Sequence, residues 1–150
     1  MSDIEITNAT VGDGDAIVAL LQRAELPTDG LAAHLATAYV ARRGNQIVGS
    51  VALEVYTDGA LLRSVAVDPT CRDTGLGHRL TTYALARAEE RALPAVYLLT
   101  TTAEAYFPRF GFERIDRADV PASLQASVEF QGACPASATV MRKWLVTLGA

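Results

Sequence analysis

The chain has 150 residues, about half of them hydrophobic, and a formal net charge of −4 at pH 7. This length fits one domain with a sizeable core, so we expect a single unit over residues 1–150. An acidic chain does not suit a nucleic-acid partner, which favours a basic patch. No apolar run approaches the roughly 20 residues that span a bilayer, and the N-terminus lacks a signal-peptide pattern. Since Cys71 and Cys134 make no disulfide framework, we expect a cytoplasmic protein without a membrane partner.

The first 67 residues predict four strands and two short helices. Apolar runs and alternations indicate the strands, which are Ile4–Ile6, Tyr39–Arg42, Gln46–Val55 and Leu61–Val67. Asp13 or Asp15 can cap the first helix, whose apolar face is Ile17, Leu20, Leu21 and Ala24. The second helix follows a break at 26–30 and carries Leu31, Leu35 and Ala38. Turn residues at 43–45 and 58–59 join the later strands as hairpins.

The rest of the chain alternates helices and strands. A long helix runs from the glycines near residue 75 to about Arg91, and a buried strand follows at Ala95–Leu99. Thr100–Arg109 reads as a short helix, with Thr101 and Glu104 spaced as a capping box and Gly111 as its stop. Two further strands are expected at Phe112–Ile115 and Thr139–Leu145. This order predicts an α/β fold, a mixed sheet with helices on both faces.

The stretch Leu61–Leu80 carries the strongest functional signal. Asp68-Pro69 ends its strand, because proline cannot donate to a β-ladder, and a helix starts beyond the glycines. At such a turn the first amides of the helix are free to bind an anion, which the helix dipole also favours. A Walker loop is excluded because no Gly-Lys-Ser/Thr follows. A dinucleotide fingerprint is excluded because Leu80 stands at its third glycine.

The pattern Arg72-x-x-Gly75-x-Gly77 after Val-Asp-Pro resembles the coenzyme A loop of GNAT N-acetyltransferases. The resemblance implies one GNAT domain that transfers an acetyl group directly from its cosubstrate, acetyl-CoA, to an amine without a metal. The backbone of Val65, Ala66 and Val67 would then bind the pantetheine and polarise the acetyl carbonyl. The pyrophosphate would lie on the backbone of Arg72, Asp73, Thr74, Gly75, Leu76, Gly77 and His78. The alternative is a surface turn whose glycines only relieve crowding.

A second segment, Thr100–Phe112, resembles the family's Asn-x-x-Ala…Tyr segment beside the cofactor. Thr100 stands in the asparagine place and Phe107 in the place of the tyrosine that often protonates the leaving thiolate, so both are expected at the cofactor. Tyr106 is then either the catalytic acid or an aromatic packed beside the cofactor, and a water can also serve. Two carboxylates lie in apolar surroundings. Glu129 is the candidate base, and Glu54 is either an exposed strand position or part of the substrate site.

Three segments, 26–31, 97–103 and 120–138, resemble the arsenic-resistance branch of the GNAT family, typified by arsinothricin N-acetyltransferase. The middle segment is also similar to the acetyltransferase domain of N-acetylglutamate synthases. The resemblance implies a glutamate-like substrate, of the arsinothricin or phosphinothricin type, that is acetylated on its α-amine. Alternation places Arg63 on the same face as Val65 and Val67. Arg63 is either the guanidinium that binds an anionic end of this substrate or a structural ion-pair arginine.

Two alternatives stay open. The chain can be a GNAT enzyme for another amine, such as glutamate, a polyamine, an aminoglycoside or a protein N-terminus. It can also be a catalytically silent acyl-CoA-binding sensor, because Phe107 cannot donate a proton. In the favoured case the partner is a small-molecule amine, an amino acid, and a homodimer is left open.

Overall fold

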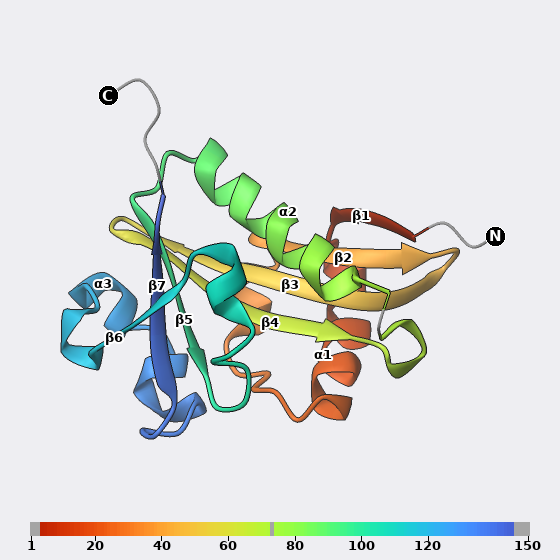
Figure 1. Ribbon diagram of the computed structural model, residues 1–150. Coiled ribbons are helices and arrows are strands. Elements are labelled where there is room, and N and C mark those ends of the chain that lie inside the picture. Colours follow the sequence, from red (N-terminus) through yellow and green to blue (C-terminus); the bar gives the residue numbers. More distant parts are fainter. Residues whose placement is uncertain (1–3, 73, 146–150) are drawn as a thin grey trace.

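The computed structural model describes residues 4–72 and 74–145, which form a seven-stranded mixed sheet (Figure 1). The strand order is β1-β2-β3-β4-β5-β7-β6, and every neighbouring pair is antiparallel except β4 with β5. Each of the seven predicted strands is present. The strands are β1 (Ile4–Asn8), β2 (Ala38–Arg43), β3 (Gln46–Tyr56), β4 (Gly59–Val67), β5 (Ala95–Thr100), β6 (Glu113–Ile115) and β7 (Thr139–Trp144).

Helices cover both faces of the sheet, as the sequence predicted. The α-helices are α1 (Gly14–Arg23), α2 (Leu76–Glu90) and α3 (Ala122–Gln125). Short 3₁₀ segments lie at Val11–Asp13, Leu31–Thr37, Pro69–Cys71, Phe107–Phe110 and Arg117–Asp119, and one π-helical turn lies at Glu129–Ala133. Figure 1 shows α2 along the central strands, with α3 at the β6–β7 end of the sheet. Within the described residues, no helix is both long and apolar enough to span a bilayer.

Alternating side chains of β2 divide between two cores. Tyr39 and Ala41 join the core beneath α2, whereas Ala38 and Val40 join the core beneath α1. A third cluster, which includes Leu61 and Leu124, lies between the sheet and α3. The period-two alternation of a strand therefore serves two apolar layers, as expected for a sheet that is covered on both faces.

Strands β4 and β5 pair over only two residues and then part. Ala60 pairs with Val96 and Leu61 with Tyr97, while β4 continues to Val67 and β5 to Thr100 without further pairing to each other. A β-bulge follows the last pair. Ser64 has a positive φ of 63°, and the register against β3 shifts between Ser50 and Ala52. Because a bulge bends and twists its strand, it accounts for the divergence of β4 from β5.

The bulge also reverses the face on which Arg63 lies. Val65 and Val67 pack against the core beneath α2, whereas Arg63 pairs with Ala52, a member of the core beneath α1. Paired residues of an antiparallel ladder share a face. The prediction that Arg63 points with Val65 and Val67 is therefore wrong, because simple alternation does not hold across the extra residue of a bulge.

The two short helices that the sequence predicted are less regular than expected. Leu31–Thr37 is a 3₁₀ segment that is kinked at His34, and Ala38 already belongs to β2. In Thr100–Arg109, the 3₁₀ segment begins only at Phe107, with Pro108 in its first turn. The capping box at Thr101 and Glu104 is wrong, since the Thr100 hydroxyl accepts the hydrogen bond from the Ala103 amide at 2.9 Å.

Two helix ends also differ in detail. The Asp13 carboxylate does not cap α1; it accepts hydrogen bonds from the Thr10 amide and from Arg42. Gly111 ends the 3₁₀ segment at Phe107–Phe110 with φ 96°, the left-handed conformation that glycine adopts without strain.

Candidate active site

A cavity of about 330 Å³ lies where β4 and β5 part. The β4 wall runs from Leu62 to Val67, the β5 wall from Leu98 to Thr100, and Thr102, Ala103, Tyr106 and Phe107 close one side. The backbone of β4 from Leu62 to Val67 faces no partner residue on β5. An extended ligand inserted here can therefore hydrogen-bond to β4 as an additional strand does. Six predicted cofactor residues line this cavity: Val65, Ala66, Val67, Arg72, Thr100 and Phe107.

A second cavity, of about 470 Å³, lies at the N-terminus of α2. Gly75 precedes the helix in the left-handed conformation, with φ 80°, and no side chain caps the first turn. The first amides of the helix and its dipole therefore suit an anion at this end. The cavity brings together Arg72, Gly75, Leu76, Gly77 and His78. Thr74 donates its hydroxyl hydrogen to the Cys71 carbonyl, and Asp73 lies outside the described residues.

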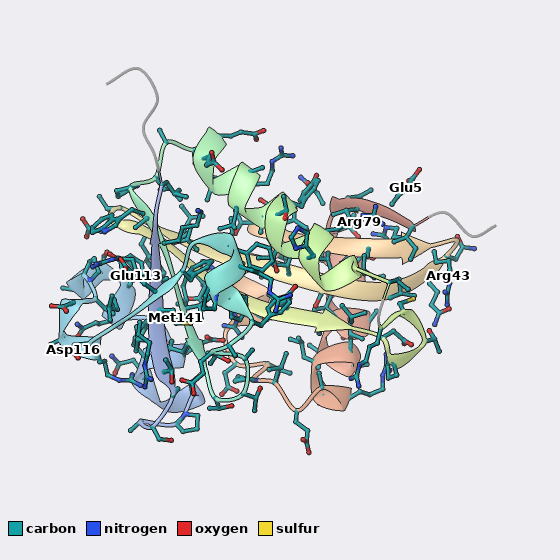
Figure 2. The ribbon with its side chains drawn as sticks, in the orientation of Figure 1. Glu5, Arg43, Arg79, Glu113, Asp116 and Met141 are labelled. Atoms are coloured by element: carbon teal, nitrogen blue, oxygen red, sulfur yellow. The ribbon has the colours of Figure 1, made fainter. Side chains whose placement is uncertain are left out.

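The first two cavities adjoin each other. They share Val67, Arg72 and Tyr106, so a ligand can run from the gap between the strands to the start of α2. Arg79 does not turn toward this anion site, because its guanidinium donates to the Ile4 carbonyl of β1 at 3.1 Å (Figure 2).

Tyr106 lies between these two cavities. A methyl group on Gly77 would stand 3.6 Å from the Tyr106 hydroxyl, so this hydroxyl lies against the first turn of α2. Burial raises the pKa of Tyr106, although the nearby Arg109 acts against the rise. The Arg109 guanidinium lies over the Tyr106 ring at 4.3 Å from its centroid. Tyr106 as the acid stays a prediction, and its hydroxyl lies beside the start of α2.

A third cavity, of about 410 Å³, adjoins the first on the other side. The two share Leu26, Leu99, Thr100 and Thr102. The rest of the lining is Glu25, Pro27, Thr101, Cys134, Pro135 and Ala138. The segment 120–138 thus reaches this cavity through Cys134, Pro135 and Ala138. Glu25 supplies the only charged side chain in the described lining.

Arg63 lies between two carboxylates beside these cavities. Its Nη1 atom donates to Oε2 of Glu54 at 2.7 Å, and its Nε atom lies 3.2 Å from Oε2 of Glu129. The Arg63 and Glu54 side chains are fully buried, and that of Glu129 is 5% exposed. The exposed position considered for Glu54 is therefore wrong. The structure has the ion-pair arrangement of Arg63, while direct contact of Arg63 with a substrate stays a prediction.

The two carboxyl groups differ in acidity. Burial favours the neutral form of Glu54, but hydrogen bonds from Ser127, Tyr56 and Arg63 outweigh it and lower the pKa. Burial raises the pKa of Glu129 to about 7, with Arg63 opposing the rise and Glu54 adding to it. Carboxyl pairs whose environments separate their pKa values in this way are typical of acid–base sites.

Sequence reasoning missed three participants in this cluster. Ser127 donates to Oε1 of Glu54 at 2.6 Å, and Tyr56 donates to the same oxygen. The pKa of the Cys134 thiol is raised to about 12 by burial and by the Glu129 carboxylate beside it. Ser127 and Cys134 lie in the segment 120–138, which carried part of the family resemblance. The sequence thus indicated the segment as a whole but not these two residues.

Comparison with known families identifies the chain. A family model described as the acetyltransferase (GNAT) domain matches residues 34–114. The chain belongs to the GNAT acetyltransferase family. The match includes the divergent strands β4 and β5 and the start of α2, where the first two cavities lie. In the described part of this GNAT chain, no group of three or more His, Cys, Asp or Glu residues could hold a metal ion.

Among curated proteins, the chain is 36% identical over 80 residues to an amino-acid acetyltransferase of Mycobacterium tuberculosis. That alignment covers 53% of this chain and 45% of the relative, so the chain spans less than half of that protein. It is also 26% identical over 131 residues to an uncharacterized N-acetyltransferase of Chlorobaculum tepidum, over 82% of this chain and 84% of the relative.

Among solved structures, the N-acetylglutamate synthase of Neisseria gonorrhoeae, complexed with coenzyme A and N-acetylglutamate, has a TM-score of 0.82. Its identity to this chain is 20%, and the superposition covers 98% of this chain and 36% of the synthase. Rv2747 of M. tuberculosis, in complex with CoA and NLQ, has a TM-score of 0.77 at 24% identity. The superposition covers 95% of this chain and 99% of Rv2747. At these identities the likeness shows the shared fold.

Proposed function

We propose that this chain is an acetyl-CoA-dependent N-acetyltransferase that transfers the acetyl group directly to a primary amine. The observation that carries the proposal is the parting of β4 and β5 after Leu61 and Tyr97. It leaves a cavity that adjoins a second one at the N-terminus of α2, and the two together suit an extended chain with a phosphate end. Membership of the GNAT family supports this occupant.

In this proposal the backbone of Val65, Ala66 and Val67 binds the pantetheine and polarises the thioester carbonyl. The first-turn amides of α2 and the loop Arg72–His78, Asp73 included, hold the pyrophosphate. Thr100 and Phe107 line the same cavity from the opposite wall. The protein supplies mainly position to a reaction between two bound reactants, which is itself a large share of catalysis.

The amine must lose a proton before it attacks, and Glu129 is the proposed base. With its pKa near 7, Glu129 is partly ionised at neutral pH and can accept that proton, directly or through one water. The neutral amine then forms a bond to the acetyl carbon while the bond from that carbon to sulfur breaks, and the nitrogen, now positively charged, gives its second proton to solvent. The departing thiolate takes a proton from water or from Tyr106.

For the substrate we propose the α-amine of a small glutamate-like amino acid, of the arsinothricin or phosphinothricin type. The curated amino-acid acetyltransferase and the glutamate-related ligand of the gonococcal synthase support an amino acid. The resemblance of segments 26–31, 97–103 and 120–138 to the arsenic-resistance branch supports the glutamate analogues. Glu54 and Arg63 would lie at the substrate end of the site. Arg63 and Arg72 are the two cationic residues in the described lining of the first and third cavities.

One observation favours a different amine. Glu25 is the only charged residue in the described lining of the third cavity, and the three threonines beside it are neutral. An uncharged or cationic amine suits this lining better than a substrate with two anionic ends. A GNAT enzyme that acts on another amine, such as a polyamine, therefore remains a second candidate. A cytoplasmic location and a homodimer stay predictions.

Thiol release from acetyl-CoA tests the proposal. Phosphinothricin, glutamate, neutral amino acids and a polyamine are supplied in turn, and the acetylated product is identified by mass spectrometry. We expect thiol release that requires both acetyl-CoA and one of the amino acids. Binding of acetyl-CoA without release by any amine would instead support the silent sensor, and failure to bind acetyl-CoA would overturn the proposal.

A further inference from the structure

Arg63 contacts Glu54, Glu129 and the Pro27 carbonyl, and Pro27 lines the third cavity. We propose that Arg63 is a positioning residue, which fixes Glu129 and the Pro27 carbonyl in a single arrangement. The inference rests on the proposed function, because the carboxylate that Arg63 positions is the base of the proposed reaction. It assigns Arg63 a role other than direct contact with the substrate.

The contacts of the guanidinium leave it little freedom. The Nη1 atom donates to Glu54 on β3 at 2.7 Å, and the Nη2 atom donates to the Pro27 carbonyl at 3.3 Å. The Nε atom donates to the Ser64 hydroxyl at 3.1 Å and lies 3.2 Å from Glu129. The Arg63 side chain is 0% exposed. A planar, rigid fork with partners in three directions holds those partners more strictly than a flexible ammonium could.

Residues of both contacted segments line the third cavity. Pro27 lines the third cavity, and so does Cys134, which lies beside Glu129. The segments also touch each other directly. A methyl group on Gly30 would stand 2.7 Å from Cγ2 of Val128 and 3.6 Å from Nη1 of Arg63. The turn at residues 27–30 therefore packs closely against the segment that carries Glu129, and Arg63 contacts both segments.

The charges around Glu129 are unequal. The titratable groups that act on it are Arg63 from β4, Glu54 from β3 and the Cys134 thiol. His34 lies 3.8 Å from Glu54, and Tyr56 also contacts that carboxylate, while Arg117 acts on Cys134. One guanidinium faces two carboxylates. Arg63 favours the ionised form of Glu129 and Glu54 disfavours it, so the two neighbours must shift its titration in opposite directions.

Because Arg63 and Glu54 shift the titration of Glu129 in opposite directions, replacing each of them tests the proposal. The pH dependence of kcat/KM for the best amine is measured for the parent chain, Arg63→Met, Arg63→Lys and Glu54→Gln. Without the positive charge, the Arg63→Met variant should have its acid limb moved to higher pH by roughly one to three units. Glu54→Gln should move the same limb to lower pH. Arg63→Lys keeps the charge but not the fork, so we expect a lower kcat with a smaller displacement of the limb.

A readout without activity separates this inference from the proposed function. The Glu129 carboxyl is titrated by ¹³C NMR in each folded variant and is assigned through Glu129→Gln. If Glu129→Gln leaves the acid limb of the parent in place, Glu129 is not the base and that part of the proposed function fails. The carboxyl titrations still test Arg63 in that case, because they require no turnover.

Three outcomes overturn the positioning role. One is a Glu129 titration that Arg63→Lys and Glu54→Gln both leave unchanged; these milder variants carry the test if Arg63→Met does not fold. Another is a shift of the same sign in Arg63→Met and Glu54→Gln. The third is a higher KM for anionic amines alone, with unchanged kcat and pH profile, which would make Arg63 a direct substrate contact.

Discussion

Nη1 of Arg63 lies 2.7 Å from Oε2 of Glu54, and neither side chain is exposed to solvent. The pair joins β3 to β4 beside the bulge that separates β4 from β5. The exposed pair Arg87–Glu90 on α2 has the same separation of 2.7 Å, with side chains 31% and 63% exposed. The two pairs differ in burial and not in distance, so their contributions to stability should differ.

We predict that Glu54→Ala lowers the free energy of unfolding by about 3 kcal/mol or more. Removing one member of a buried pair typically costs ~3–5 kcal/mol, because the partner is left without compensation. Here Ser127 and Tyr56 also lose their acceptor. Glu90→Ala is the matched control and should cost less than about 1 kcal/mol, because the exposed pair is screened by water. Urea unfolding of both variants measures the difference, and equal losses would contradict the prediction.

Glu129 should make the stability of the chain depend on pH. Its folded-state pKa of about 7 exceeds its usual value of 4.5, so the folded state binds the proton more tightly than the unfolded state. The resulting stabilisation is complete below pH 4.5 and is lost as the pH rises through 7. We expect Glu129→Gln to remove this dependence over that interval. Denaturant unfolding at several pH values measures it, and a parent chain whose stability has no such downward component would contradict the assigned pKa.

Glu54 affects the pH dependence of stability in the opposite direction. The same unfolding measurements must therefore separate its effect from that of Glu129. Its folded-state pKa is lowered, so its contribution is present above its unfolded value of 4.5 and is lost as the pH falls through the lowered value. The two effects fall on different sides of pH 4.5. A chain with Glu129→Gln should therefore keep the acid-side loss while it no longer weakens between pH 4.5 and 7.

The sequence predicted the sheet and the turn before α2 better than the surroundings of Arg63 and Glu54. Strand patterns and the glycine turn at Gly75 and Gly77 are local signals. The structure has the expected strands, and α2 begins at the glycine turn. The direction of the Arg63 side chain depends on the bulge at Ser64, which has a left-handed backbone conformation. A serine in the sequence does not predict that conformation. Serine is not among the residues that commonly adopt positive φ, so alternation was the natural expectation.

The cluster around Glu54 could not be predicted for a different reason. Glu54 and Ser127 are 73 positions apart, and their contact depends on how the segment 120–138 folds back over β3 and β4. That segment contains one turn of α-helix and one π-helical turn with a kink at Gly132, so it has no hydrophobic period to read. A family resemblance signalled its importance but not the contacts that it makes.

We predict that Tyr106→Phe lowers turnover by less than about a hundredfold, the low end of general acid catalysis. The Tyr106 hydroxyl lies against Gly77 at the start of α2, so its loss should affect acetyl-CoA binding as much as turnover. Steady-state kinetics and acetyl-CoA titration measure the two effects. A loss of several thousandfold, with unchanged fold and unchanged affinity for acetyl-CoA, would show that Tyr106 is the acid.

The anion site at the start of α2 gives the last prediction. A Cβ atom on Gly77 would meet only ordinary contacts, at 3.6 Å from the Tyr106 hydroxyl and 3.7 Å from Val67, so Gly77→Ala should fold and bind acetyl-CoA. Gly77→Glu adds bulk and a negative charge where the helix amides are proposed to hold a pyrophosphate, and it should abolish binding. Gly75→Glu should do the same, with added strain from the left-handed φ of 80°.

Gly12→Glu is the matched control for Gly77→Glu, because its Cβ atom would have only the Thr10 hydroxyl nearby, at 3.8 Å. It adds the same charge away from the cavities at β4 and α2. Calorimetric titration with acetyl-CoA, together with the melting temperature of each variant, separates lost binding from lost folding. If folded Gly77→Glu binds acetyl-CoA as tightly as Gly12→Glu does, the pyrophosphate does not lie at the amides of α2, and the cavity there must serve another end of the ligand.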